Sequence, residues 1–117
     1  MRQIKLSKFR AACMERFPGG LLEVEFVCPS CKTVQTGNDL IKAGAGKDYD
    51  EVSGYFGFSC VGRFNKKAKG CDWTLGGFFQ IHTFEIVCDE TGSVRPCFEL
   101  NPPLENGVFV VGEGSNV

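Results

Sequence analysis

Four cysteines in this chain have the types of neighbours and the spacing expected of ligands to one tetrahedral metal ion. They are Cys28, Cys31, Cys60 and Cys71. The first two flank Pro29-Ser30 on a tight turn, where backbone N–H groups can point at the first sulfur and favour the thiolate that zinc requires. Cys60 is followed two residues later by Gly62, a glycine able to take positive φ, and Gly70 precedes Cys71. Ten residues separate Cys60 from Cys71, where about two to four are usual. The pattern predicts one Zn²⁺ held by four thiolates.

Three other uses of these cysteines fit the sequence less well. A disulfide framework is typical of secreted domains, but residues 1–5 lead into a polar segment without an apolar signal region, and seven cysteines is an odd number. A redox dithiol of the thioredoxin kind lies near a βαβ pattern, whereas residues 32–35 indicate a short extended segment. A catalytic zinc keeps one coordination position open, and four thiolates leave none. We therefore predict a structural zinc in a reducing, cytoplasmic environment.

The length and composition indicate one small globular domain. The chain has 117 residues, of which 43% are hydrophobic and 23% charged, and no apolar run approaches the roughly 18 residues that span a bilayer. A net charge of -1 argues against a general nucleic-acid coat, for which a basic excess is usual. Eleven phenylalanines predict an aromatic core, and fifteen glycines predict many turns and short strands.

We therefore expect an α+β fold. It would be a small zinc-ribbon-like domain with an N-terminal helix packed on an antiparallel sheet of short strands. Residues 1–103 form the predicted zinc-binding domain, and residues 104–117 form a C-terminal strand, near 108–111, with a frayed tail.

The first helix is expected from about Lys8 to Phe17, with Ser7 as its cap and Pro18-Gly19-Gly20 at its end. A stripe of Phe9, Cys13 and Phe17 would face the core, with Cys13 as a small buried hydrophobe. Alternation of apolar residues with Glu23 and Glu25 then predicts a strand over residues 22–26, which leads into the first cysteine pair.

Later elements surround the second cysteine pair. Thr36 and Asp39 resemble a capping box that opens a short helix over residues 39–43, which Gly44 would end. Residues 55–59 are predicted to form a strand that runs into Cys60. Residues 73–87 are rich in β-formers, and the turn at 89–93 before residues 94–100 predicts a hairpin.

Three residues of that hairpin carry reactive side chains. Cys88 and Cys97 are predicted to be unlinked thiols on its two arms, because neither has a close cysteine partner. His82, the single histidine, is expected to be a sheet residue rather than a ligand or a general base. We therefore predict no catalytic residue.

One local concentration of charge lies in the loop between the two distal cysteines. Its members are Arg63, Phe64, Lys66, Lys67 and Lys69. Basic residues interleaved with an aromatic ring can hold phosphates while the ring stacks on an unpaired base, and the same chemistry suits an acidic protein surface. The alternative is a solvated loop whose lysines keep the domain soluble. The sequence leaves both open.

Several segments together resemble a family of short, uncharacterised, cysteine-rich proteins encoded by phages and prophages. The segments are Cys28-Pro-Ser-Cys31, Val34-Gln-Thr36, Phe58-Ser-Cys-Val-Gly-Arg-Phe64 and Gly70-Cys-Asp-Trp-Thr-Leu-Gly-Gly-Phe-Phe79. The resemblance covers about residues 22–100 and implies a phage accessory protein in the cytosol of a bacterial host. It supplies no catalytic residue.

From the site and the resemblance, we expect a non-enzymatic protein that binds and inhibits or modulates a bacterial host macromolecule, such as an antiviral defence complex. The alternative is a nucleic-acid-binding accessory module of phage replication or transcription that uses the basic loop at 63–69. An enzyme ranks third, because no nucleophile–base arrangement, carboxylate pair or open metal position is evident.

Overall fold

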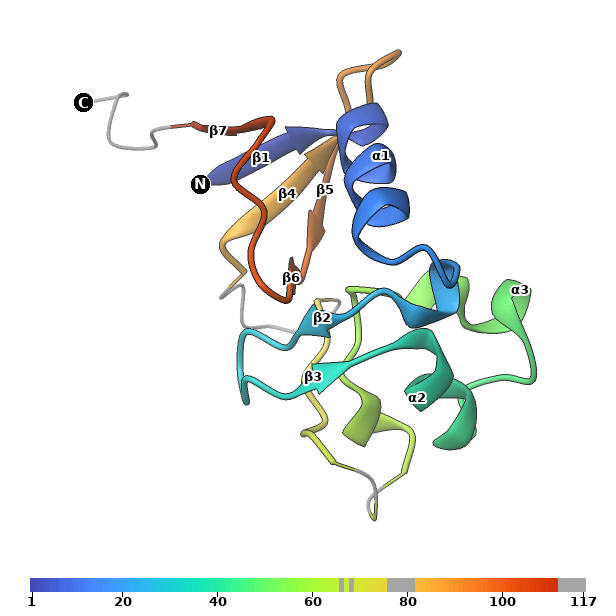
Figure 1. Ribbon diagram of the computed structural model, residues 1–117. Helices are drawn as coiled ribbons and strands as arrows, with labels where there is room; N and C mark the ends of the chain where they lie inside the picture. The colour runs from blue at the N-terminus through green and yellow to red at the C-terminus, as the bar shows by residue number, and fades with distance from the viewer. Residues whose placement is uncertain (66, 68, 76–81, 112–117) are drawn as a thin grey trace.

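The fold is built from two small sheets that lie in different parts of the molecule (Figure 1). The computed structural model describes residues 1–65, 67, 69–75 and 82–111. One sheet has the order β5-β4-β1-β7 and the other the order β3-β2-β6. The strands are β1 (Arg2–Lys5), β2 (Phe26–Val27), β3 (Val34–Gln35), β4 (Phe84–Val87), β5 (Val94–Cys97), β6 (Glu99–Leu100) and β7 (Val108–Val110). The α-helices are α1 (Leu6–Arg16), α2 (Gly37–Lys42) and α3 (Tyr49–Val52), and the 3₁₀ turns are η1 (Leu21–Glu23), η2 (Ser53–Tyr55) and η3 (Val61–Arg63).

The four-stranded sheet is mixed, so the prediction of an antiparallel sheet is wrong for it. Strand β1 pairs in parallel with β4, in a register that sets Arg2 beside Phe84, and pairs antiparallel with β7. Its central place follows from burial, because Ile4 is fully buried, and from a side-chain bond between Gln3 and Glu85 at 2.7 Å. The three-stranded sheet is antiparallel throughout. Together with helix α1, the two sheets confirm the α+β class.

Helix α1 is confirmed, but its cap is not the one that the sequence predicts. The N-cap residue is Lys5, and no side chain of the helix itself closes the first turn. The Ser7 backbone N–H and hydroxyl instead donate to the two carboxylate oxygens of Asp89, at 2.9 and 2.7 Å. Asp89 lies in the β4–β5 turn, so a segment far along the chain satisfies the helix start. Cys13 is buried, as predicted.

The strand predicted over residues 22–26 is mostly absent. Gly20 has a φ of 116°, and the chain then makes the 3₁₀ turn η1 before β2 begins at Phe26. The alternation of burial is real, since Val24 and Phe26 are buried, but only Phe26 and Val27 have strand partners.

The predicted strand at residues 55–59 is also wrong. The chain there forms η2 and a turn, and only Ser59 makes a β-bridge, to Thr74. Gly57 explains the turn: its φ is 61°, and a Cβ at this position would lie 2.8 Å from both the Phe26 ring and Cys97 Sγ. Helix α2, by contrast, has the predicted capping box between Thr36 and Asp39.

The hairpin of β4 and β5 is confirmed, with its turn after Cys88. Cys88 and Cys97 are free thiols. His82 precedes β4 and places Nε2 3.2 Å from Glu85 Oε2. Residues 76–81 of the predicted hairpin and residues 112–117 of the predicted tail lie outside the described residues. Strand β7 falls where the C-terminal strand was expected, and it pairs with β1.

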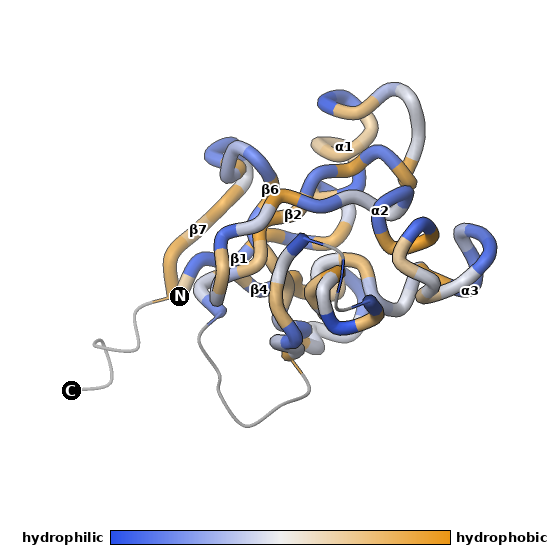
Figure 2. The backbone as a smooth tube through the Cα atoms, turned by 90° about the horizontal axis from the view of Figure 1, so that it is seen from below, coloured by the Kyte–Doolittle hydropathy of each residue, from blue (hydrophilic) through white to orange (hydrophobic). Residues whose placement is uncertain are grey.

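The core joins the two sheets through aromatic rings. Phe84 and Phe98 are almost fully buried, and Trp73 stacks on Phe98 with ring centroids 5.8 Å apart. Figure 2 shows hydrophobic segments along β2 and β7 and hydrophilic turns between the elements. No helix in the described part of the chain is long and apolar enough to cross a membrane.

Candidate metal centre

The four predicted cysteines meet at one point. Their four Sγ atoms all lie within 4.8 Å of one another. The Cys28–Cys71 and Cys31–Cys60 sulfur pairs are each 3.8 Å apart. A regular tetrahedron around Zn²⁺, with Zn–S bonds of about 2.3 Å, has sulfur–sulfur edges of about 3.8 Å. The arrangement therefore fits a metal ion held by four thiolates.

The first cysteine pair lies on the turn that joins β2 to β3. The Cys28 N–H donates to the Thr33 carbonyl oxygen at 3.1 Å, and the Lys32 N–H donates to the Cys28 carbonyl oxygen at 2.8 Å. Lys32 itself has a φ of 64°, in the left-handed region that non-glycine residues rarely adopt. This folded-back turn points both sulfurs to the same side.

The second cysteine pair depends on two glycines, each for a different reason. Gly70 has a φ of 97°, and a Cβ there would lie 2.6 Å from Cys60 Sγ. Gly62 does not have the positive φ that the sequence suggested, since it falls within the ordinary 3₁₀ turn η3. A Cβ at Gly62 would instead lie 2.7 Å from the backbone nitrogen of Cys71. Gly62 thus allows the two halves of the loop to approach closely.

Hydrogen-bond donors surround the sulfur of Cys60. The Cys71 N–H donates to it at 3.2 Å, and Gln35 Nε2 donates at 3.5 Å. The hydrogen bond shared with the Cys28 thiol is the largest cause that lowers the pKa of Cys60 to about 4, and the N–H donors add to it. The same shared bond, together with burial, raises the pKa of Cys28. The N–H donors therefore favour the thiolate form of Cys60, and a bound cation would favour that form in all four ligands.

Gln35 is a supporting residue that the sequence pattern did not indicate. It is only 3% exposed, and its Oε1 accepts the Val61 N–H at 2.7 Å while its Nε2 reaches Cys60 Sγ. One amide side chain thus ties strand β3 of the first half of the site to η3 of the second. Nothing in the neighbouring residues separates Gln35 from an ordinary exposed polar residue.

The predicted basic loop is held in place by contacts within the chain. Lys69 forms an ion pair with Asp39 at 3.1 Å, and Arg63 Nη1 donates to the Asp72 carbonyl oxygen at 3.0 Å. Lys67 is exposed. Lys66 lies outside the described residues.

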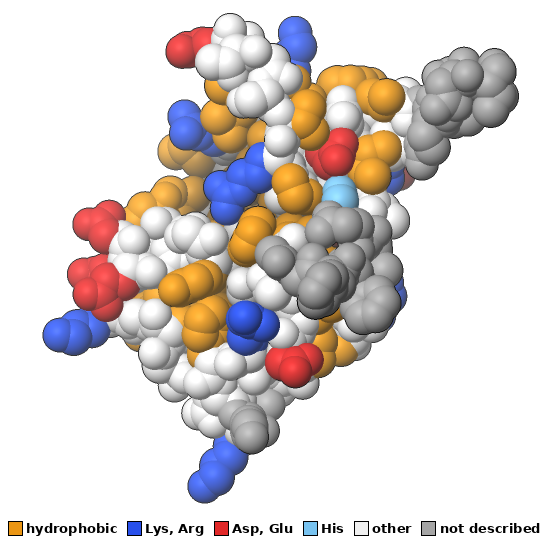
Figure 3. Space-filling model, turned by 180° about the vertical axis from the view of Figure 1, so that it is seen from behind, with side chains coloured by type: hydrophobic (Ala, Val, Ile, Leu, Met, Phe, Trp, Pro, Cys, Tyr) orange, Lys and Arg blue, Asp and Glu red, His pale blue; other side chains and the backbone are white. Residues whose placement is uncertain are grey.

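Phe64 is half-buried and packs against the hydrophobic core. Its ring centroid lies 4.7 Å from that of Tyr55, which is 36% exposed. The two rings form one aromatic contact beside Arg63. On the face of the molecule in Figure 3, positive side chains are scattered among apolar and acidic ones rather than gathered into one track.

Of the comparisons with known proteins, the one with protein families finds a match. The VVA0879-like family matches residues 5–101, a span that holds all four cysteines of the site. No curated protein and no solved structure matches the chain.

Proposed function

The chain belongs to the VVA0879-like family, and we propose that it is a non-enzymatic, zinc-stabilised protein that acts by binding another macromolecule. The observation that carries this proposal is the four-sulfur cluster, whose members all lie within 4.8 Å. Four thiolates complete a tetrahedral shell, so the metal offers no position for a substrate or a reactive water. Its contribution is to the fold.

A zinc-held loop is a good binding element because it is ordered before the partner arrives. The chain leaves the site after Cys60 and returns to it at Cys71, and the Cys71 N–H donates to Cys60 Sγ at the base of the loop. Little conformational entropy is then lost on association. The proposed partner surface consists of Arg63, Phe64, Lys66, Lys67 and Lys69.

The residues of this surface differ in what they can offer to a partner. Lys69 is already paired with Asp39, which reduces the charge that it offers to a partner. Arg63 and Lys67 are exposed and would attract an acidic surface. The Phe64 ring is held by Tyr55, so the exposed edge of this pair would supply the apolar contact.

The resemblance to phage-encoded proteins supports a partner in the bacterial host. We propose that the protein inhibits or modulates that partner, such as an antiviral defence complex, by covering its surface. A nucleic acid is the second candidate, favoured by the aromatic pair of Tyr55 and Phe64 beside Arg63, where an unpaired base could stack.

The test is a pull-down from bacterial lysate, with and without nuclease, using wild type, Arg63→Glu and Phe64→Ala. Lys42→Glu is the matched control, because Lys42 is an exposed lysine on α2, outside the loop. We expect the two loop variants to lose a protein that wild type and the control retain after nuclease treatment. Equal capture by all four proteins would contradict the proposed surface.

A second measurement separates inhibition from simple binding. The protein is expressed in bacteria that carry defined defence systems, and the cells are challenged with sensitive phages. Restored plaques with wild type, and none with Arg63→Glu, are expected for an inhibitor. If capture depends on nucleic acid and no defence is relieved, the nucleic-acid module is the better explanation.

A further inference from the structure

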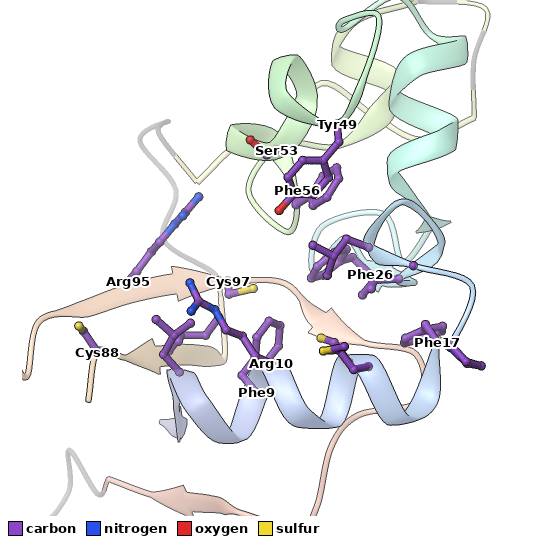
Figure 4. A pocket seen from close by; sticks show the side chains of 18 of the residues that line it. Phe9, Arg10, Phe17, Phe26, Tyr49, Ser53, Phe56, Cys88, Arg95 and Cys97 are labelled. Carbon is purple, nitrogen blue, oxygen red and sulfur yellow. The ribbon is translucent and has the colours of Figure 1, made fainter. Parts of the chain in front are cut away.

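A second candidate site lies apart from the zinc centre, in an apolar cavity of about 600 Å³ between helix α1, the β4–β5 hairpin and the α3–η2 segment (Figure 4). None of the four clustered cysteines lines it. Five aromatic side chains do, and they are Phe9, Phe17, Phe26, Tyr49 and Phe56. Ligand pockets in proteins are mostly apolar and measure roughly 300–1,000 Å³, so this cavity has the size and the lining of one.

The walls of the cavity come from both parts of the fold. Phe9 lies on α1 and Phe17 directly follows this helix, while Tyr49 and Phe56 lie across from them, on and just after the α3–η2 segment (Figure 4). Tyr49 meets Phe56 edge-on, with ring centroids 5.5 Å apart. Met14 and Leu21, which also line the cavity, are 71% and 44% exposed. Apolar surface is therefore open to water at the mouth, where a ligand could cover it.

The charges around the cavity have one sign. Arg10 and Arg95 are its charged lining residues, and no aspartate or glutamate is among the residues that line it. Both arginines are exposed, and both lie on the hairpin side of the cavity (Figure 4).

Neither guanidinium is paired with an acid in the part of the chain that the structure describes. No ion pair or hydrogen bond joins the side chain of Arg10 or Arg95 to another described residue, whereas Arg2 bonds to Glu99 at 2.8 Å. Among the described residues, the Arg95 guanidinium makes a cation–π contact with the face of Phe58, 5.6 Å from its ring centroid. An arginine presents a planar set of donors that fits a carboxylate.

We propose that this cavity binds an anionic amphiphile, a small molecule with an apolar body and a single carboxylate head. The body lies among the phenylalanine rings, and the head lies at the rim with Arg10 and Arg95. Three thiols line the cavity, and the two buried ones, Cys13 and Cys97, agree with an apolar interior: burial raises their pKa to about 11 and about 12, so both are uncharged at neutral pH. This inference does not depend on the function proposed for the zinc-held loop.

The first experiment titrates the zinc-loaded, full-length protein with decanoate, 1-decanol and decylamine and follows binding by calorimetry. The three probes share one tail and differ in the charge of the head at neutral pH. We expect decanoate to bind most tightly, decanol about ten- to a hundredfold more weakly, and the decylammonium cation least, because a hydrogen bond to a charged group contributes roughly one to two factors of ten. Equal affinity for decanoate and decylammonium would overturn the proposal.

Variants then locate the head group. Arg10→Gln and Arg95→Gln should each weaken decanoate about tenfold and leave decanol unchanged. Lys8→Gln is the matched control, since it removes one positive charge from an exposed position of α1 that does not line the cavity. The Arg10 side chain has no hydrogen bond or ion pair to another described residue, so Arg10→Gln should not disturb the fold. It therefore tests the head-group position even if Arg95→Gln disturbs the packing on Phe58.

Two outcomes would assign the cavity to a different occupant and overturn the small-molecule proposal. One is a concentration-dependent dimer in light scattering that excludes decanoate, which would make a second copy the occupant. The other is tight binding of an acidic, apolar peptide without measurable binding of decanoate. Loss of decanoate binding in the double variant Arg10→Gln/Arg95→Gln, with zinc content unchanged, supports it.

Discussion

Substitution of Cys60 by serine should release the metal and unfold the part of the chain that surrounds it. Cys60 is fully buried, and its sulfur accepts from both the Cys71 N–H and the Gln35 amide. Cys60→Ser leaves three thiolates and a weaker oxygen ligand. We expect one zinc per chain in the wild type and none in the variant after gel filtration.

The expected loss of stability is large, because few other contacts hold the region around the four cysteines. Strands β2 and β3 have two residues each, and Ser59 and Thr74 form a single bridge. Structural zinc contributes apparent free energies of about 10–16 kcal/mol in small peptides, and a whole domain is stable by only about 5–15 kcal/mol. Loss of the metal should therefore remove most of the free energy of unfolding.

The assay combines metal analysis, thermal melting and amide hydrogen exchange. The amides of Cys60 and Arg63, which bond to the Trp73 and Cys60 carbonyl oxygens at 3.0 Å, should lose protection in Cys60→Ser and in wild type treated with chelator. Cys13→Ala, Cys88→Ala and Cys97→Ala are the controls and should keep one zinc per chain. Wild type that is free of zinc after reduction, or whose melting a chelator leaves unchanged, would refute the reasoning.

Three other predictions concern single contacts. Gly70→Ala should lower zinc occupancy, because its Cβ would meet Cys60 Sγ at 2.6 Å, whereas Gly92→Ala, with a φ of 75° and open space around it, should cost only about 1–2 kcal/mol of backbone strain and keep the metal; equal zinc content in both variants would contradict this. Asp39→Asn should cost about 1 kcal/mol in urea unfolding, since it weakens the capping box and the Lys69 pair. Burial raises the pKa of Asp39, but the hydrogen bonds from Thr36 and the charge of Lys69 outweigh burial and lower this pKa below its ordinary value of about 4. The Asp39 carboxylate therefore stabilises the fold above about pH 4, and this stabilisation disappears as the pH falls below that value. A stability difference between the wild type and the Asp39→Asn variant that stays the same at every pH would contradict this explanation. Asp89→Asn should lower the melting temperature by loosening the start of α1, and an unchanged melting curve would show that the Ser7 contact is dispensable.

Local signals in the sequence were enough to predict the elements whose partners lie nearby. The capping box of Thr36 and Asp39 spans four residues, and the β4–β5 turn joins adjacent strands. The four cysteines were also predictable, because few residue types bind zinc and the Cys28–Cys31 spacing is short. The physical cause of each of these features lies in residues that are close together in the sequence.

Features that depend on distant residues were not predictable in this way. Strand β1 is four residues long and is held by β4 and β7, both far along the chain. Asp89 closes the first turn of α1 from the hairpin, so Ser7, the nearer candidate, was assigned the wrong role. At residues 55–59, β propensity was overridden by Gly57, whose backbone must approach Phe26 and Cys97.

The central position of β1 sets an order of events during synthesis. Gln3 and Glu85, which bond across β1 and β4, are 82 positions apart, so residues 2–5 leave the ribosome long before their partner strand exists. The cysteine site needs only the span from Cys28 to Cys71. If the site binds a metal, a nascent chain could acquire it while the four-stranded sheet is still incomplete. The metal would then shorten the stretch of free chain that must close to bring β1 and β4 together.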